Sequence, residues 1–117
     1  MFETIDWHIC IDANSKEKAK RVIKRLSQEI GEIEILSLKE HWKDATKYEL
    51  YSETKLRFEE PEKAIYNVLQ LVNSLCNEVS VIGPSKYEGN RIEFEGICLS
   101  PKIVGISWFR FNIANFR

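Results

Sequence analysis

The chain has 117 residues, of which 44% are hydrophobic and 30% charged, a composition typical of a globular protein and too apolar for disorder. Its 17 Lys and Arg residues stand against 18 Asp and Glu residues, for a formal net charge of -1. This balance excludes the global basic excess that supplies most non-specific affinity for nucleic acid. No stretch has the length of a membrane span or the pattern of a secretory signal. We therefore expect one domain over residues 1–117, with no nucleic-acid partner and no membrane.

The first half of the chain predicts a strand, a helix and two more strands. Residues 4–12 alternate between apolar and polar side chains, as in a half-buried strand. Asn14, with Glu17 three residues on, forms a capping-box pattern before a helical apolar series that ends at Gly31. Residues 32–40 read as a second strand, whose apolar side chains change sides and so require a bulge or burial on both faces. Residues 48–58 alternate again.

The second half predicts a helix, a short strand and a hairpin. Pro61 suits the first turn of a helix with an apolar stripe that extends to Leu75. Residues 79–82 form a short strand, and residues 91–99 and 103–113 flank a turn as a C-terminal hairpin. The resulting βαββαβ order with an added β-hairpin predicts an α+β, two-layer, ferredoxin-like fold, in which an antiparallel sheet carries both helices on one face.

The motifs of catalysis and metal binding are missing from the sequence. His8 and His41 have no partner at metal-ligand spacing, and the scattered glycines form no phosphate loop. The three cysteines, Cys10, Cys76 and Cys98, are odd in number and never in a CxxC arrangement. They predict neither a disulfide framework nor a zinc site, and a reducing cytoplasm suits them. We expect no catalytic residue, no metal and no cofactor.

The candidate partner-binding surface is the polar face of the strands over residues 4–12 and 48–58, which a ferredoxin-like sheet places side by side. It consists of Asp6, His8, Asp12, Glu49, Tyr51 and Glu53. The RNA-binding version of this fold carries aromatic and basic residues there, whereas here the charge is acidic. An acidic sheet repels phosphate and suits a basic protein partner. A merely solvated face explains these residues equally well.

The aromatic residues near the C-terminus are the second notable feature. Residues 105–116 hold so many apolar side chains, among them Trp108, Phe109 and Phe111, that both faces of the last strand become apolar. They belong either to the core, which a small domain favours, or to a contact surface.

In size, lone α+β domain, lack of catalytic motifs and acidic strand face, the chain resembles the small cytoplasmic immunity proteins encoded beside bacterial contact-dependent and other polymorphic toxins. The acidic residues that carry the resemblance are Asp6, Asp12, Glu49 and Glu53. The resemblance implies a tight inhibitory complex with a cognate toxin domain, often a basic nuclease. Two alternatives stay open. The chain can be a ferredoxin-like regulatory or ligand-binding module that dimerises, or a small enzyme with a cleft under the C-terminal hairpin.

Overall fold

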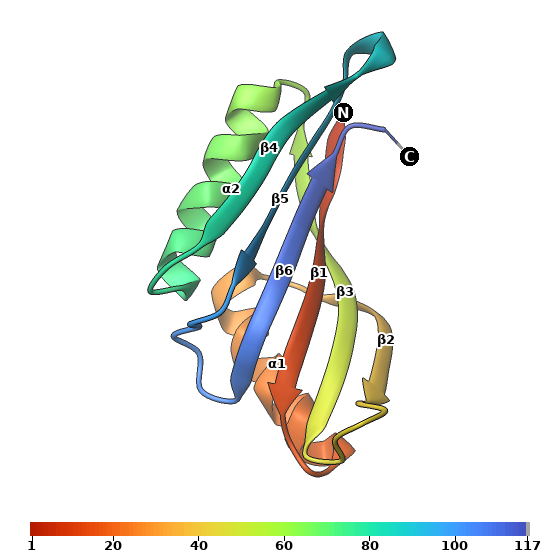
Figure 1. Cartoon of the computed structure of the whole chain (residues 1–117), viewed down its shortest axis with the longest axis vertical. Coiled ribbons are helices and arrows are strands. Elements are labelled where there is room, and N and C mark those ends of the chain that lie inside the picture. The colour runs from red at the N-terminus through yellow and green to blue at the C-terminus, as the bar shows by residue number, and fades with distance from the viewer. Residues whose placement is uncertain (117) are drawn as a thin grey trace.

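The computed structural model describes residues 1–116, which form six strands and two α-helices around one core (Figure 1). In chain order the elements are β1 (Phe2–Asp12), α1 (Lys16–Ile30), β2 (Glu34–Glu40), β3 (Lys47–Phe58), α2 (Pro61–Leu75), β4 (Ser80–Tyr87), a single 3₁₀ turn (Glu88–Asn90), β5 (Arg91–Cys98) and β6 (Ile106–Ala114).

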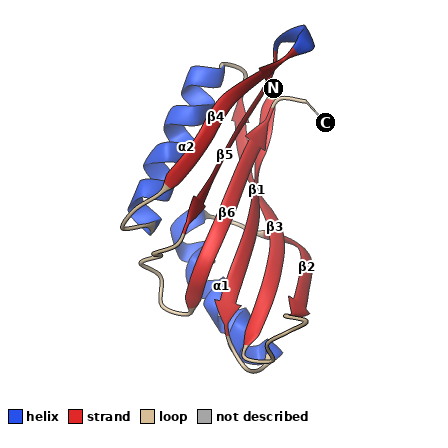
Figure 2. Ribbon diagram, in the orientation of Figure 1, coloured by secondary structure: helices blue, strands red, loops and turns tan. Residues whose placement is uncertain are grey.

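All six strands pair antiparallel in one sheet with the order β2-β3-β1-β6-β5-β4. Both helices contact β1 and β3 and lie behind the sheet in Figure 2. The α+β class and the two-layer arrangement with both helices on one face are therefore confirmed.

The exact ferredoxin-like order is not confirmed, because the hairpin is inserted in the sheet and is not appended to it. In the expected order the strand after α2 would pair with β1, but β4 lies at the far edge and β6 pairs with β1. The composition of the two strands explains the exchange. Phe109, Phe111 and Ile113 of β6 are all buried, so this strand stabilises the centre of the sheet. Gly83 and Pro84 interrupt β4, and proline is tolerated mainly in edge strands.

Several local predictions hold and three need correction. Gly31 ends α1 and Pro61 starts α2 as expected, and β2 has the expected bulge, between Ile35 and Ser37. The N-cap of α1, however, is Ser15 and not Asn14, because the Ser15 hydroxyl accepts the hydrogen bond from the Lys18 amide at 3.3 Å. Strand β4 does not end at Gly83 but continues to Tyr87.

The core fills the space between the sheet and the two helices. Alternate residues of β1 point into it, and they meet the buried stripes of α1 and α2. The aromatic centre consists of Trp7, Phe109 and Phe111, with the Trp7 and Phe109 rings 5.7 Å apart and inclined at 64° in an edge-on contact. Gly96 on β5 leaves room for Phe111, since a Cβ atom there would lie 2.6 Å from its ring. Phe109 and Phe111 thus belong to the core, as the small size of the domain favours, whereas Trp108 does not.

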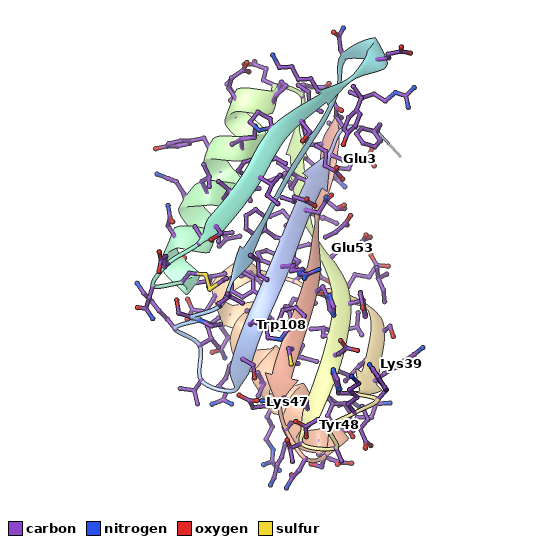
Figure 3. The ribbon with its side chains drawn as sticks, in the orientation of Figure 1. Glu3, Lys39, Lys47, Tyr48, Glu53 and Trp108 are labelled. Atoms are coloured by element: carbon purple, nitrogen blue, oxygen red, sulfur yellow. A yellow bond between two sulfur atoms is a disulfide. The ribbon has the colours of Figure 1, made fainter. Side chains whose placement is uncertain are left out.

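The third correction concerns the cysteines. Cys76, directly after α2, and Cys98, at the end of β5, form a disulfide, and Cys10 remains a free, buried thiol. The S–S bond is visible beneath the lower end of α2 (Figure 3). The prediction that no cysteine is paired is wrong for this pair, because the chain between Cys76 and Cys98 folds back through β4 and β5. Spacing along the chain gives no sign of that return.

Candidate binding face on the open side of the sheet

The face of the sheet opposite the two helices, called the open face below, collects the predicted site residues. The pairing of β1 with β3 places Asp6 opposite Glu53 and His8 opposite Tyr51. Glu49 lies opposite Cys10. The period-2 alternation of both strands turns these side chains away from the core. All six predicted residues lie on the open face, as the side-by-side placement of these two strands requires.

His8, Tyr51 and Trp108 form an aromatic cluster at the middle of the open face. The His8 and Tyr51 rings stack 4.2 Å apart with their planes 15° from parallel. Trp108 of β6 meets the His8 ring edge-on at 4.9 Å. The Nε2 atom of His8 lies 3.3 Å from the Glu49 carboxylate, which orients the imidazole. The cluster is fixed by contacts between three adjacent strands while Tyr51 remains 44% exposed.

An acidic row crosses the sheet next to this cluster. It runs from Glu34 on β2 through Glu53 and Asp6 to Asn112 on β6 and Glu95 on β5, each directly opposite the next. The Asn112 amide donates a hydrogen bond of 2.8 Å to Glu93, which lies beside the row on β5. The row presents carboxylates from four strands to one side of the molecule, and Figure 3 shows Glu53 at its β3 position.

A pocket of about 460 Å³ opens on the β4 side of the acidic row and the aromatic cluster. Its lining residues are Asp6, Trp7, His8, Tyr51, Ser80, Ile82, Glu95, Gly96, Ile97, Arg110, Phe111 and Asn112. Its surface is mainly apolar, with the carboxylates of Asp6 and Glu95 and the guanidinium of Arg110 as the charged groups. Such a pocket accepts an apolar or planar side chain and can pair a polar group at its edge.

Asp12 lies on the open face but takes no part in the acidic row or the aromatic cluster. Its carboxylate forms an ion pair with Lys47 and accepts a hydrogen bond from the Ser107 hydroxyl. Burial raises the pKa of Asp12, but these hydrogen bonds and the Lys47 charge outweigh it, so the pKa lies below its usual value of 3.8. The same hydrogen bond raises the pKa of Lys47 above 10.5. The negative charge of Asp12 is therefore neutralised within the protein and is not available to a partner.

Cys10 lies between Glu49 and Trp108 on the open face but is only 4% exposed. Burial is the main cause of the raised pKa of its thiol, although the Lys47 charge and a Ser107 hydrogen bond act in the opposite direction. The raised pKa and the burial both disfavour the thiolate, which is the reactive form of cysteine.

The sequence-based site lacked the contribution of the C-terminal hairpin. Trp108, Arg110 and Asn112 from β6 and Glu93 and Glu95 from β5 complete the surface. In the sequence, Phe109, Phe111 and Ile113 alternate with Arg110 and Asn112, a signal that could have assigned the polar residues of β6 to one face. Without knowing that β6 pairs with β1, however, that face could not be joined to the predicted one.

Across residues 1–116, no group of three or more His, Cys, Asp or Glu side chains has the arrangement of a metal site. Neither described helix is long and apolar enough to cross a membrane. Comparisons with known proteins find no family model, no curated protein and no solved structure that matches the chain.

Proposed function

We propose that this chain is an immunity-type inhibitor that binds a cognate basic toxin domain, most simply a nuclease, through its open face. The observation that carries the proposal is the acidic row beside the aromatic cluster and its pocket, on the one sheet face that α1 and α2 leave uncovered. Carboxylates from four strands match a basic protein surface, and charge complementarity of this kind raises the association rate and restricts the choice of partner.

The aromatic cluster supplies the second element that a tight complex requires. Tyr and Trp are enriched among the few residues that dominate binding energy at interfaces. Tyr51 is fixed by the stack with His8 and lines the pocket, so little side-chain freedom is lost when a partner covers it. A side chain inserted in the pocket would lie on Tyr51 and Ile97 while Asp6 and Glu95 meet a basic group at its edge.

The finer points of the fold and location belong to the same proposal. We infer that the first half keeps the ferredoxin-like order β2-β3-β1, into which the hairpin β5–β6 has been inserted. As an inhibitor of an intracellular toxin the chain would act in the cytoplasm. The expectation of a cytoplasmic location relied on unpaired cysteines, and the Cys76–Cys98 disulfide withdraws that support. The proposed location therefore follows from the proposed function alone.

Growth rescue in cells that co-express the candidate toxin domain of the adjacent gene tests the proposal. The wild-type chain should protect. A variant that combines Asp6→Asn, Glu53→Gln and Glu95→Gln should bind more slowly, because it loses the charge that steers association. Tyr51→Ala should dissociate faster and weaken binding by about 2 kcal/mol or more, the size expected of an interface hot spot. Stopped-flow and surface-binding measurements separate these two effects.

A matched control removes three exposed carboxylates away from the open face, with Glu62→Gln, Glu78→Gln and Glu88→Gln. Its net charge equals that of the acidic-row variant, so rescue and association rate should stay at the wild-type level if location matters. Circular dichroism verifies that each variant is folded. Equal loss in both triple variants would assign the effect to overall charge, and failure of the wild-type chain to bind or protect would end the immunity proposal.

The pocket supports a second candidate, a module that binds a small ligand in a regulatory role. Its largely apolar lining with a few convergent charged groups fits this class. A saturable thermal shift by a small molecule, abolished by Ile97→Lys within the pocket, would favour it. The small-enzyme alternative assumed a cleft under an appended hairpin, whereas β5 and β6 are strands of the sheet itself.

A further inference from the structure

The helix α1 carries a charge that the near-neutral total conceals. Its 15 residues include six Lys and Arg and two Glu, a formal charge of +4. Since the whole chain has a formal charge of -1, all the other residues together carry -5. The protein is therefore a charge dipole, with the acidic row on the open face and the basic helix on the opposite side of the sheet (Figure 1).

The basic residues of α1 are arranged as two rows on its solvent side. Ala19, Val22, Ile23 and Leu26 are buried against the sheet. Lys16, Lys20 and Lys24 follow one another at four-residue spacing, and so do Arg21 and Arg25. These five residues, called the basic face below, are all exposed. Within residues 1–116 none of them has an ion pair shorter than 4.0 Å.

We propose that the basic face binds the phosphate backbone of duplex nucleic acid. A 15-residue helix is about 22 Å long, and duplex DNA of that length carries about 13 phosphates. The five cations lie within about 14 Å of this helix, a length over which one DNA strand carries about four phosphates. They therefore match the charge of a single strand, and contact with the backbone alone needs no base-reading side chains. The basic face lies opposite the open face, so its binding of nucleic acid is independent of the proposed inhibitory function. Both faces can be occupied at the same time.

The distribution of apolar side chains distinguishes nucleic acid from a membrane surface as the partner. A helix that lies in a bilayer interface inserts an apolar face among the lipids. The apolar stripe of α1 is already packed in the core, and none of the large exposed hydrophobic side chains of residues 1–116 lies on α1. Helix α1 can therefore offer charge alone, which suits a polyanion with regularly spaced phosphates.

Fluorescence anisotropy with labelled DNA and RNA duplexes of about 20 base pairs tests the proposal, with the whole chain and no protein partner. With five phosphate contacts the slope of log affinity against log salt should be about -4.5, so affinity should fall a few hundred-fold between about 50 and about 200 mM salt. The triple variant Lys20→Gln, Arg21→Gln, Lys24→Gln should bring the slope to about -1.8. Glutamine keeps helix propensity close to that of lysine and arginine, and circular dichroism verifies the fold.

The matched control removes three exposed lysines elsewhere, with Lys39→Gln, Lys43→Gln and Lys55→Gln. It has the same net charge and should keep the wild-type slope, and so should the charge-preserving double variant Arg21→Lys, Arg25→Lys. Absence of salt-dependent duplex binding by the wild-type chain would overturn the proposal. So would equal losses in the α1 variant and the control, or binding to phosphatidylserine vesicles without binding to duplexes. None of these results depends on toxin rescue, so the two proposals fail separately.

Discussion

The covered and open faces of the sheet are made by the same strands yet differ in composition and role. Along β1, Ile5, Trp7, Ile9 and Ile11 point toward the helices, and Asp6, His8, Cys10 and Asp12 point away from them. Pleating assigns neighbouring residues to opposite faces, so stability and recognition can be encoded on one strand with little interference. Substitutions should therefore separate by face: large losses of stability on the covered face, and losses of binding with little unfolding on the open face.

The strongest test of this comparison uses one aromatic residue from each face. Phe111 is 2% exposed and packs between Trp7 and Phe94, so Phe111→Ala should lower the free energy of unfolding by about 3 to 5 kcal/mol. Tyr51→Ala on the open face should cost about 1 kcal/mol, mostly the lost stack with His8. Urea denaturation measures both. Similar costs for the two variants would contradict the division between faces.

The cysteines provide the next largest contrast. Because the Cys76–Cys98 disulfide closes a loop with a sequence separation of 22, the double variant Cys76→Ala, Cys98→Ala should lose about 3 kcal/mol of stability. Cys10→Ala, toward the open face, should lose less. Non-reducing peptide mass mapping and urea denaturation provide the measurements. Three free thiols in protein purified without reductant would restore the expectation drawn from the cysteine pattern.

Two neighbouring hydroxyl residues of β3 test how polar groups are accommodated on the covered face. Thr54 accepts a hydrogen bond of 2.9 Å from the Trp7 indole, so Thr54→Val should cost about 1 to 3 kcal/mol by leaving that donor unpaired. The Ser52 hydroxyl is buried with no partner among residues 1–116, so Ser52→Ala should raise stability by up to about 1 kcal/mol. Thermal and urea unfolding measure the change in stability of both variants. A destabilised Ser52→Ala would show that the hydroxyl has a partner.

The smallest expected effect belongs to the open face. The pKa of Asp12 is lowered from its ordinary value of 3.8 in the folded protein. The ionised carboxylate therefore stabilises the fold fully above pH 3.8, and this contribution disappears as the pH falls through the lowered pKa. Because the Asp12–Lys47 pair is partly exposed, Asp12→Asn should cost under about 1 kcal/mol at neutral pH. Urea denaturation against pH should show the difference vanish in acid. A difference that grows in acid would contradict this assignment.

The local elements and part of the site were readable from the sequence because they depend on neighbours along the chain. Alternation in residues 4–12 and 48–58 assigned one face to Asp6, His8, Asp12, Glu49, Tyr51 and Glu53. The split βαβ connection then placed the two strands together. The basic face of α1 was also present as a run of Lys and Arg, but the net charge averaged it away. Whole-chain charge thus does not report the charge of either face when opposite charges lie on opposite sides of a sheet.

Only the tertiary structure decided which strand pairs with β1 on the side away from β3. That choice also decided which strands contribute the other half of the open face. Both β4 and β6 are antiparallel candidates for that position, and local patterns do not rank them. The choice follows from packing, since Phe109, Phe111 and Ile113 of β6 fill the space beneath the helices and β4 has no comparable face. The same packing brings Trp108 to His8 and Cys76 to Cys98. Strand pairing depends on how distant apolar faces fit together, and that information is spread over the whole chain.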